Sequence, residues 1–294
     1  DLVKFTDGPV NGDVQQTEKF RYGVMGKAFQ TPLGHSGDHT TIDWGYLYLA
    51  GCGPEARFAY DSEKERLDGI VELGTESESG GIVAAYDDLV SINYFGQWRK
   101  AYWTKEYPTI FDAIGASLDE REDVLKKSEA LDRSLTERAR EMGGEDYELL
   151  CCLSYRQAVA AHKLIEDGNL IFLSKENDSN GCIGTADVSY PSVPLFLMYS
   201  TDYIKGMLRP VFRFASCDVW EYDFAPHDVG RYPYAWGQVY GLNPEKKGKQ
   251  YLQANGAVFP PYYQYPPCDV YDLKFQMPVE ECGNMLIMTA ACCE

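Results

Sequence analysis

The feature that most constrains the fold is a change of residue pattern after the first third of the chain. Residues 1–110 are rich in Gly, Thr, Tyr and Val, and short apolar runs such as 46–50 and 81–85 are separated by turn residues. This pattern is typical of β-strands, and a β-sandwich is a common way to bury them. Residues 1–19 carry few strand signals, so we expect the chain to enter the sandwich part-way. The pattern predicts a partial β-sandwich domain over residues 1–112.

A helical domain is predicted over residues 113–294, which makes the chain α+β. Ser117 followed by Glu120 has the form of a capping box, so we expect a long solvated helix to start there and to end at the Gly143–Gly144 pair. Residues 145–167 predict a second and largely buried helix. The apolar residues that give it helical spacing are Leu149, Leu150, Leu153, Ala160, Ala161, Leu164 and Ile165.

Shorter elements follow Gly168. Residues 170–173 predict a strand, and three helices are expected, from near Tyr190, after a cap at Thr201 or Asp202, and from Val279. Pro210 predicts a kink in the second of these helices. The connecting loops are long and rich in Gly, Pro, Asn and Tyr, and such loops are uncommon unless they carry function.

Charge and composition limit the partners. The 294 residues include 27 Lys plus Arg and 45 Asp plus Glu, which gives a net charge of -18. A nucleic acid would be repelled by this charge, and no basic run offsets it. No apolar run approaches the roughly 20 residues of a membrane-spanning helix. We therefore expect a small-molecule substrate, no nucleic acid partner and no membrane span.

Three loop segments carry motifs that are long enough to be specific. They are SKENDSNGCIGTADVSYPS over residues 174–192, FAPHDVGRYP over residues 224–233 and MPVEECGNML over residues 277–286. Weaker matches lie at residues 42–50 and 153–158. Together these segments resemble the glutaminase A family, and the likeness extends over most of the chain.

The resemblance implies a β-sandwich followed by an (α/α) toroid of the six-hairpin glycosidase type. It also implies glutamine deamidation in a secreted or periplasmic protein. Members of the family continue well past the motif at residues 277–286, so the toroid is expected to be truncated here. A second chain that completes the ring is a further expected partner.

Hydrolysis of an amide or a glycosidic bond needs one group that activates water and one that protonates the leaving group, and paired carboxylates can do both. The motifs supply five candidate catalytic carboxylates, which are Glu176, Asp187, Asp228, Glu280 and Glu281. The alternative for each of them is helix capping or ion pairing. Serine amidase chemistry of the Ser-x-x-Lys type is excluded, because no serine has a Lys three places on.

Polar residues in and near the motifs are candidates for substrate binding, with bracing of the loops as the alternative. They are Lys175, Asn177, Tyr190, His227, Gln238 and Asn284, and Arg156 is a further candidate for a substrate carboxylate. His35, His39 and Asp43 form a weak metal pattern that reads better as a solvated turn, so neither a metal nor an organic cofactor is expected.

Three functions remain open from the sequence. The first is an amidohydrolase that acts on glutamine or a related small amide. The second is a glycoside hydrolase of the toroid type. The third is a surface or carbohydrate-binding fragment without catalysis.

Overall fold

The computed structural model describes residues 8–36, 42–51, 56–73, 80–176, 179–242, 262–264 and 270–293. The chain forms two compact units. The first unit comprises Asp1–Pro32, Ile42–Leu89 and Trp103–Cys152, and the second comprises Leu33–Thr41, Val90–Tyr102 and Leu153–Glu294. The described residues contain both helices and sheets, as the sequence predicts. The boundary between residues 112 and 113 stays a prediction.

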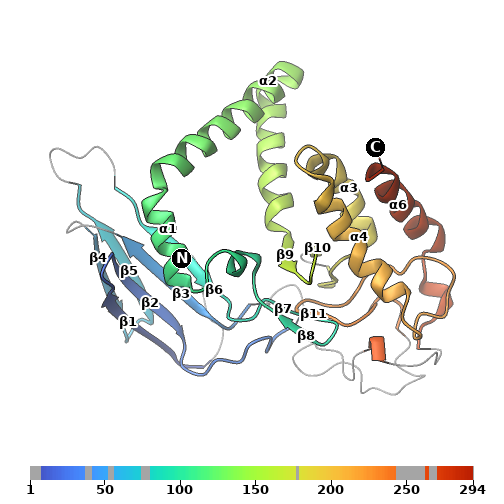
Figure 1. Cartoon of the computed structure of the whole chain (residues 1–294), viewed down its shortest axis with the longest axis horizontal. Coiled ribbons are helices and arrows are strands. Elements are labelled where there is room, and N and C mark those ends of the chain that lie inside the picture. Colours follow the sequence, from blue (N-terminus) through green and yellow to red (C-terminus); the bar gives the residue numbers. More distant parts are fainter. Residues whose placement is uncertain are drawn as a thin grey trace. The chain divides into compact units, whose positions relative to one another are not determined.

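The first unit is built on an antiparallel sheet with strand order β1-β2-β3-β6. Its strands are β1 (Val10–Gln16), β2 (Arg21–Lys27), β3 (Tyr46–Gly51) and β6 (Val83–Asp87). A separate hairpin consists of β4 (Ala56–Asp61) and β5 (Arg66–Val71). The strands run beside one another in blue and cyan in Figure 1. The apolar runs at residues 46–50 and 81–85 fall on β3 and β6, where strands were expected.

The sheet of the first unit is covered on both faces, which explains why β2 is buried along most of its length. On one face, Tyr22 and Tyr48 pack with Ile110 and Ile114 of helix α1 (Ile110–Asp119). On the other face lies the β4–β5 hairpin, and a Cβ added at Gly23 would lie 2.4 Å from Leu67 Cδ1. A larger residue at Gly23 would force the Leu67 side chain to move, because the two layers approach closely there. Closure into a β-sandwich stays a prediction.

Strand β1 lies within residues 1–19, where the sequence carries few strand signals. It pairs with β2 along its whole length. Five of its seven residues are exposed. An edge strand with so little burial needs no alternation of apolar and polar residues, so its sequence gives little strand signal.

The first helix begins earlier than predicted. The capping box of α1 is formed by Thr109 and Asp112, whereas the Ser117 hydroxyl donates to the Ala113 carbonyl within the helix. Helix α2 (Arg121–Ala160) follows directly, after Glu120. It is broken at Gly144, which has φ 81° and ψ −168°, where the Gly143–Gly144 pair predicted a helix end.

The prediction for residues 145–167 is wrong in two respects. The helix stops at Ala160, and Leu164 and Ile165 lie in strand β9 (His162–Glu166). Leu149, Leu150 and Leu153 are exposed rather than buried. Their helical spacing is real, but no described element covers that face.

Among its described residues, the second unit combines small sheets with the end of α2 and the helices α3, α4 and α6. Strand β9 pairs with β10 (Leu170–Ser174), and a second sheet has the order β11-β7-β8. The strands of that sheet are β7 (Ile92–Tyr94), β8 (Gln97–Arg99) and β11 (Tyr234–Ala235), and the helices are α3 (Ala186–Leu197), α4 (Thr201–Ala215) and α6 (Pro278–Ala291). Short 3₁₀ turns occur at Tyr102–Lys105, Tyr262–Gln264 and Leu273–Phe275. Strand β10 confirms the strand predicted at residues 170–173.

Helices α3, α4 and α6 contact one another, and Figure 1 shows them side by side in yellow to red. Helix α4 is capped by Ser200, one residue before the predicted cap, and it continues through Pro210. Its buried face packs on β10. A Cβ added at Gly206 would lie 3.1 Å from the Phe172 backbone nitrogen, so glycine permits this close contact. Helix α3 begins at Ala186, before the predicted start near Tyr190, and so carries Asp187 in its first turn.

Across the described ranges, no helix combines the length and the apolar character that crossing a bilayer requires. Whether the helices of the second unit belong to a closed toroid stays a prediction.

Candidate active site

The three motif segments are hydrogen bonded to one another in the second unit. Ile183 donates its backbone N–H to the Gly230 carbonyl at 2.9 Å, and Val229 donates to the Ile183 carbonyl at 3.0 Å. The Ala186 N–H donates to the His227 carbonyl at 2.9 Å. Helix α6, which carries the third motif, packs on α3. Residues that are far apart in sequence thus meet at one place.

Two carboxylates and one imidazole converge at this place. Asp187 lies in the first turn of α3, Glu281 in the first turn of α6, and His227 in the loop after α4. One side-chain atom from each of the three lies within 4.8 Å of the others. Glu281 is buried, with 1% of its surface exposed, whereas Asp187 is only partly buried. Asp187 therefore lies on the more accessible side of the group.

His227 is held rigidly by its neighbours. Its Nδ1 lies 3.0 Å from Asp228 Oδ2, and its backbone N–H donates to Gln238 Oε1 at 2.7 Å. Its ring stacks on Tyr240 with the centroids 4.3 Å apart. Asp228 accepts a hydrogen bond from Nδ1–H, so Nε2 is the ring nitrogen that is left for other partners.

Asp228 has a positioning role. It is fully buried and accepts backbone N–H groups from Gly230, Val239 and Tyr240 at 2.9 to 3.1 Å. Together with His227, these donors occupy both carboxylate oxygens. Asp228 therefore has no free oxygen with which to react.

The other carboxylates differ from Asp228 because they have unpartnered atoms. Both oxygens of Glu281, Oδ1 of Asp187, Oε1 of Glu176 and the side-chain nitrogen of Asn284 are buried and have no hydrogen-bond partner among the described residues. Native proteins rarely leave buried polar atoms unpaired, because each costs about 1–3 kcal/mol. A group of such atoms at one place is the signature of a site that binds something.

The electrostatics of the group follow from burial and from the proximity of like charges. Burial raises the pKa of Glu281 to about 8; the imidazole of His227 opposes this rise, and the charges of Asp187 and Glu280 add to it. Burial lowers the pKa of His227, but the hydrogen bond to Asp228 and the surrounding carboxylates raise it to a net value of about 9. At neutral pH Glu281 therefore keeps a proton that an ordinary carboxylate would have released, and His227 keeps a proton that an ordinary imidazole would largely have released.

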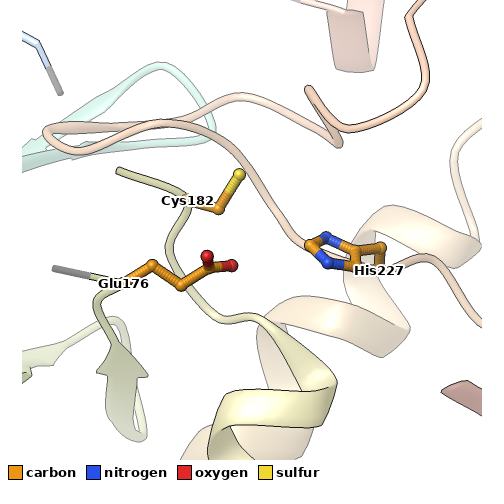
Figure 2. A group of neighbouring side chains, drawn as sticks. All are labelled: Glu176, Cys182 and His227. Carbon is orange, nitrogen blue, oxygen red and sulfur yellow. The ribbon is translucent and has the colours of Figure 1, made fainter. Parts of the chain in front are cut away.

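A second group shares the same histidine. Figure 2 shows Glu176 and Cys182 from the segment after β10 together with His227, and the Glu176 carboxylate points between the thiol and the ring. One atom from each of the three lies within 4.8 Å of the others. Glu176 Oε2 accepts from the Ser179 hydroxyl at 2.6 Å. Burial and nearby carboxylates raise the pKa of the Cys182 thiol, so it is protonated and a poor nucleophile.

The structure places most of the residues that the sequence singled out at this site. Glu176, Asp187, His227, Asp228, Gln238, Glu281 and Asn284 lie at or beside it. Glu280 is exposed although it adjoins Glu281, because successive residues of a helix point about 100° apart. Tyr190 and Arg156 are also exposed.

Two other candidates need separate mention. Lys175 Nζ lies 4.9 Å from the centre of the Tyr232 ring. Asn177 lies outside the described residues, as does His39 of the weak metal pattern. In that pattern Asp43 forms an ion pair with Lys27 at 2.5 Å.

The sequence interpretation missed Cys182 and Tyr240 as members of the site. Cys182 lies inside the first motif, so its position next to Glu176 and Asp187 was a usable signal. Tyr240 lies two residues after Gln238, and nothing in the sequence indicates that its ring stacks on His227.

The helical part of the chain has recognisable relatives. Residues 144–294, about half of the chain, match the profile of the glutaminase A six helical-hairpin domain. The chain belongs to this family. The membership confirms the resemblance carried by the three motifs, and all of them lie within the matched residues of the glutaminase A domain. Residues 68–138 match a domain of unknown function, DUF5127.

Two curated proteins are similar to the chain. Glutaminase A of Aspergillus oryzae is 30% identical over 167 residues, which is 56% of this chain and 20% of the relative. A protein of Arthroderma benhamiae named as a probable glutaminase is 27% identical over 192 residues, which is 64% of this chain and 19% of the relative. The chain thus spans about a fifth of the length of the curated relatives it matches. Their names suggest a glutaminase-like hydrolase.

Proposed function

We propose that this chain carries acid and base groups of a hydrolase that deamidates glutamine or a related small amide. The observation that carries the proposal is the convergence of Asp187, His227 and Glu281, whose reactive atoms lie within 4.8 Å of one another. The names of the relatives support the choice of an amide. An exported location and a second chain that completes a helical ring are further proposals, which rest on the family resemblance.

The proposed roles follow from exposure and pairing. Two neighbouring carboxylates resist simultaneous ionisation, so one of them keeps a proton. Glu281 is the more deeply buried and is assigned the proton. Asp187 is partly exposed and is assigned as the base that takes a proton from water. His227, fixed by Asp228, is assigned the stabilisation of the charge that develops on the amide oxygen.

The reaction balances with these groups alone. Asp187 removes a proton while the water oxygen bonds to the amide carbon, and a tetrahedral intermediate forms. Glu281 then donates its proton to the nitrogen, the carbon–nitrogen bond breaks, and ammonia and a carboxylic acid are released. The Asp187 proton returns to Glu281 through water to complete the cycle.

The test measures ammonia release from glutamine by the 294-residue chain. Glu281→Gln and Asp187→Asn are expected to lower kcat by about 100-fold or more, because each removes one proton-transfer group. Glu280→Gln is the matched control, since it alters the exposed neighbour on the same helical turn. It is expected to leave kcat within about twofold, because a carboxylate turned away from the reacting groups transfers no proton to them. Circular dichroism of each variant checks that it folds.

A glycoside hydrolase is the second candidate, and the closeness of the two carboxylates favours it. Inverting glycosidases need a separation of about 6.5–9.5 Å, so Asp187 and Glu281 fit the closer spacing of a retaining enzyme. Reducing-sugar release from a glycan panel, with no ammonia from glutamine, would favour this candidate over the amidohydrolase. If the folded chain is inactive in both assays, a catalytic role is contradicted and a carbohydrate-binding or surface function is favoured.

A further inference from the structure

The Asp187, His227 and Glu281 group has the donor set of a metal site. It offers one imidazole nitrogen and two carboxylate groups, and the three reactive atoms come from separate segments of the second unit. Imidazole and carboxylate are the usual ligands of catalytic zinc and of related divalent transition metals. Asp187 is the less buried of the two carboxylates.

The unpartnered oxygens mark a place where a cation can bind. Glu281 is 1% exposed, and neither of its oxygens meets the geometry of a hydrogen bond with a donor in the described part of the chain, although the Asn284 side chain lies close enough to act on it. Asp187 contributes a third such oxygen. A buried carboxylate is costly unless it is paired or binds a metal. The three oxygens lie beside the one ring that can complete a ligand set.

The surroundings of His227 are those of a metal-bound histidine. Such a histidine donates its other ring N–H to a carboxylate, which fixes the tautomer and the orientation of the ring. Asp228 provides this contact at 3.0 Å from Nδ1 and is itself held by backbone N–H groups. Nε2 is therefore the nitrogen left to bind an ion, which displaces the Nε2 proton when it binds.

The other group that contains His227, with Glu176 and Cys182, is less suitable for binding a metal ion. Of the Glu176 oxygens only Oε1 is unpartnered, because Oε2 accepts from Ser179. The Cys182 thiol is protonated. The guanidinium of Arg231 lies near enough to Cys182 to act on its pKa, so positive charge is already present on that side.

We propose that Asp187, His227 and Glu281 bind one divalent transition-metal ion of the zinc type, with Asp228 as the outer partner of the histidine. This departs from the sequence prediction of no metal. The ion uses the same oxygens as the proposed acid–base pair, so ion binding and proton transfer by that pair exclude one another. Zn²⁺ is therefore expected to inhibit the proposed deamidation.

The test is calorimetric titration of Zn²⁺ into the full chain at pH 8, after chelator treatment and alkylation of accessible thiols. One ion per chain is expected. Glu281→Gln and Asp187→Asn should each weaken binding by more than 10-fold, and Asp228→Asn by about 10- to 100-fold. Glu280→Gln, the exposed neighbour, should bind like the unaltered chain.

Two outcomes would overturn the site. The first is the absence of zinc binding by the folded chain. The second is unchanged binding in Glu281→Gln together with loss in Cys182→Ser, which would place the ion in the Glu176 group instead. Because the Gln and Asn variants are isosteric, circular dichroism separates loss of binding from loss of fold.

The metal proposal and the function proposal can fail separately. Zinc binding is measured without substrate, so an inactive chain that binds zinc contradicts only the deamidation proposal. If the zinc-free chain deamidates glutamine and added zinc does not inhibit it, the ion and the acid–base pair do not share the same oxygens. Activity that requires zinc would leave the binding site standing and show that the assigned acid–base roles are wrong.

Discussion

At the scale of the residue, the site depends on which polar atoms are already satisfied. Asp228 and Glu281 are both buried acidic residues of the motifs, yet Asp228 accepts three backbone N–H groups and Glu281 accepts none from described residues. The first is therefore a support for His227, and the second is available for chemistry. This difference arises from backbone geometry and cannot be seen in the sequence, where each is simply a carboxylate two residues before a glycine.

A second, partly buried histidine supports a prediction about stability. His162 stacks on Phe172 with the ring centroids 4.4 Å apart, and its Nδ1–H donates to the Ala158 carbonyl at 2.6 Å. Burial lowers its pKa below the ordinary value of 6.5, although the hydrogen bond to Ala158 opposes the shift. The unfolded chain therefore binds a proton more readily than the folded chain does.

The sign of the pH effect follows from this difference. The stabilisation from neutral His162 is complete above pH 6.5 and is lost as the pH falls through the lower folded pKa. His162→Phe removes the titration and keeps an aromatic ring. Urea unfolding at pH 7.5 and 5.5 should show a smaller loss of stability for this variant than for the unaltered chain. Equal losses in the two proteins would show that His162 does not contribute.

At the scale of the element, the helix boundaries show how local sequence misleads. Ser117 and Glu120 have the spacing of a capping box, but α1 is already formed when the chain reaches them. The true box is Thr109 and Asp112, which follows Pro108 and precedes an apolar run, and so was readable in principle. Leu164 and Ile165 continue a helical spacing by coincidence, and pairing with β10 turns them into a strand.

The two capping candidates can be compared directly by mutation. Thr109→Ala removes the side-chain acceptor for the Asp112 N–H at the start of α1 and should lower the free energy of unfolding by about 1 kcal/mol. Ser117→Ala removes only an exposed hydroxyl that donates to the Ala113 carbonyl, and it should be within about 0.5 kcal/mol of neutral. Chemical denaturation measures both. A larger effect at Ser117 than at Thr109 would contradict the helix start seen in the structure.

At the scale of the whole molecule, composition predicts an α+β chain, and the three motifs predict where the site lies. Their convergence could be expected from the resemblance, since all of them lie in one domain of the family. The choice between Glu280 and Glu281 could not, because it depends on which face of α6 packs on α3. The boundary predicted between residues 112 and 113 falls inside α1, whose Ile110 and Ile114 pack with Tyr22 of the sheet.

The division into two units leads to a calorimetric prediction that also tests this boundary. If each unit is one cooperative structure, the chain should show two thermal transitions. Thr109→Ala should lower the midpoint temperature of one transition by about 3 °C, because α1 packs on the sheet of the first unit.

Gly206→Ala should lower the midpoint temperature of the other transition. Its new Cβ would lie 2.5 Å from Leu170 Cδ2 and 3.1 Å from the Phe172 nitrogen, and overpacking of this kind costs about 1–3 kcal/mol, or about 3–9 °C for a unit of this size. Gly283→Ala is the control, since a Cβ there meets nothing within 4 Å and alanine favours the helix. Because α1 and α4 belong to different units, the Thr109 and Gly206 variants should act on different transitions. A single transition whose midpoint both variants lower would mean that the chain unfolds as one cooperative body. In that case neither the two units nor a boundary near residue 112 would correspond to parts that unfold independently.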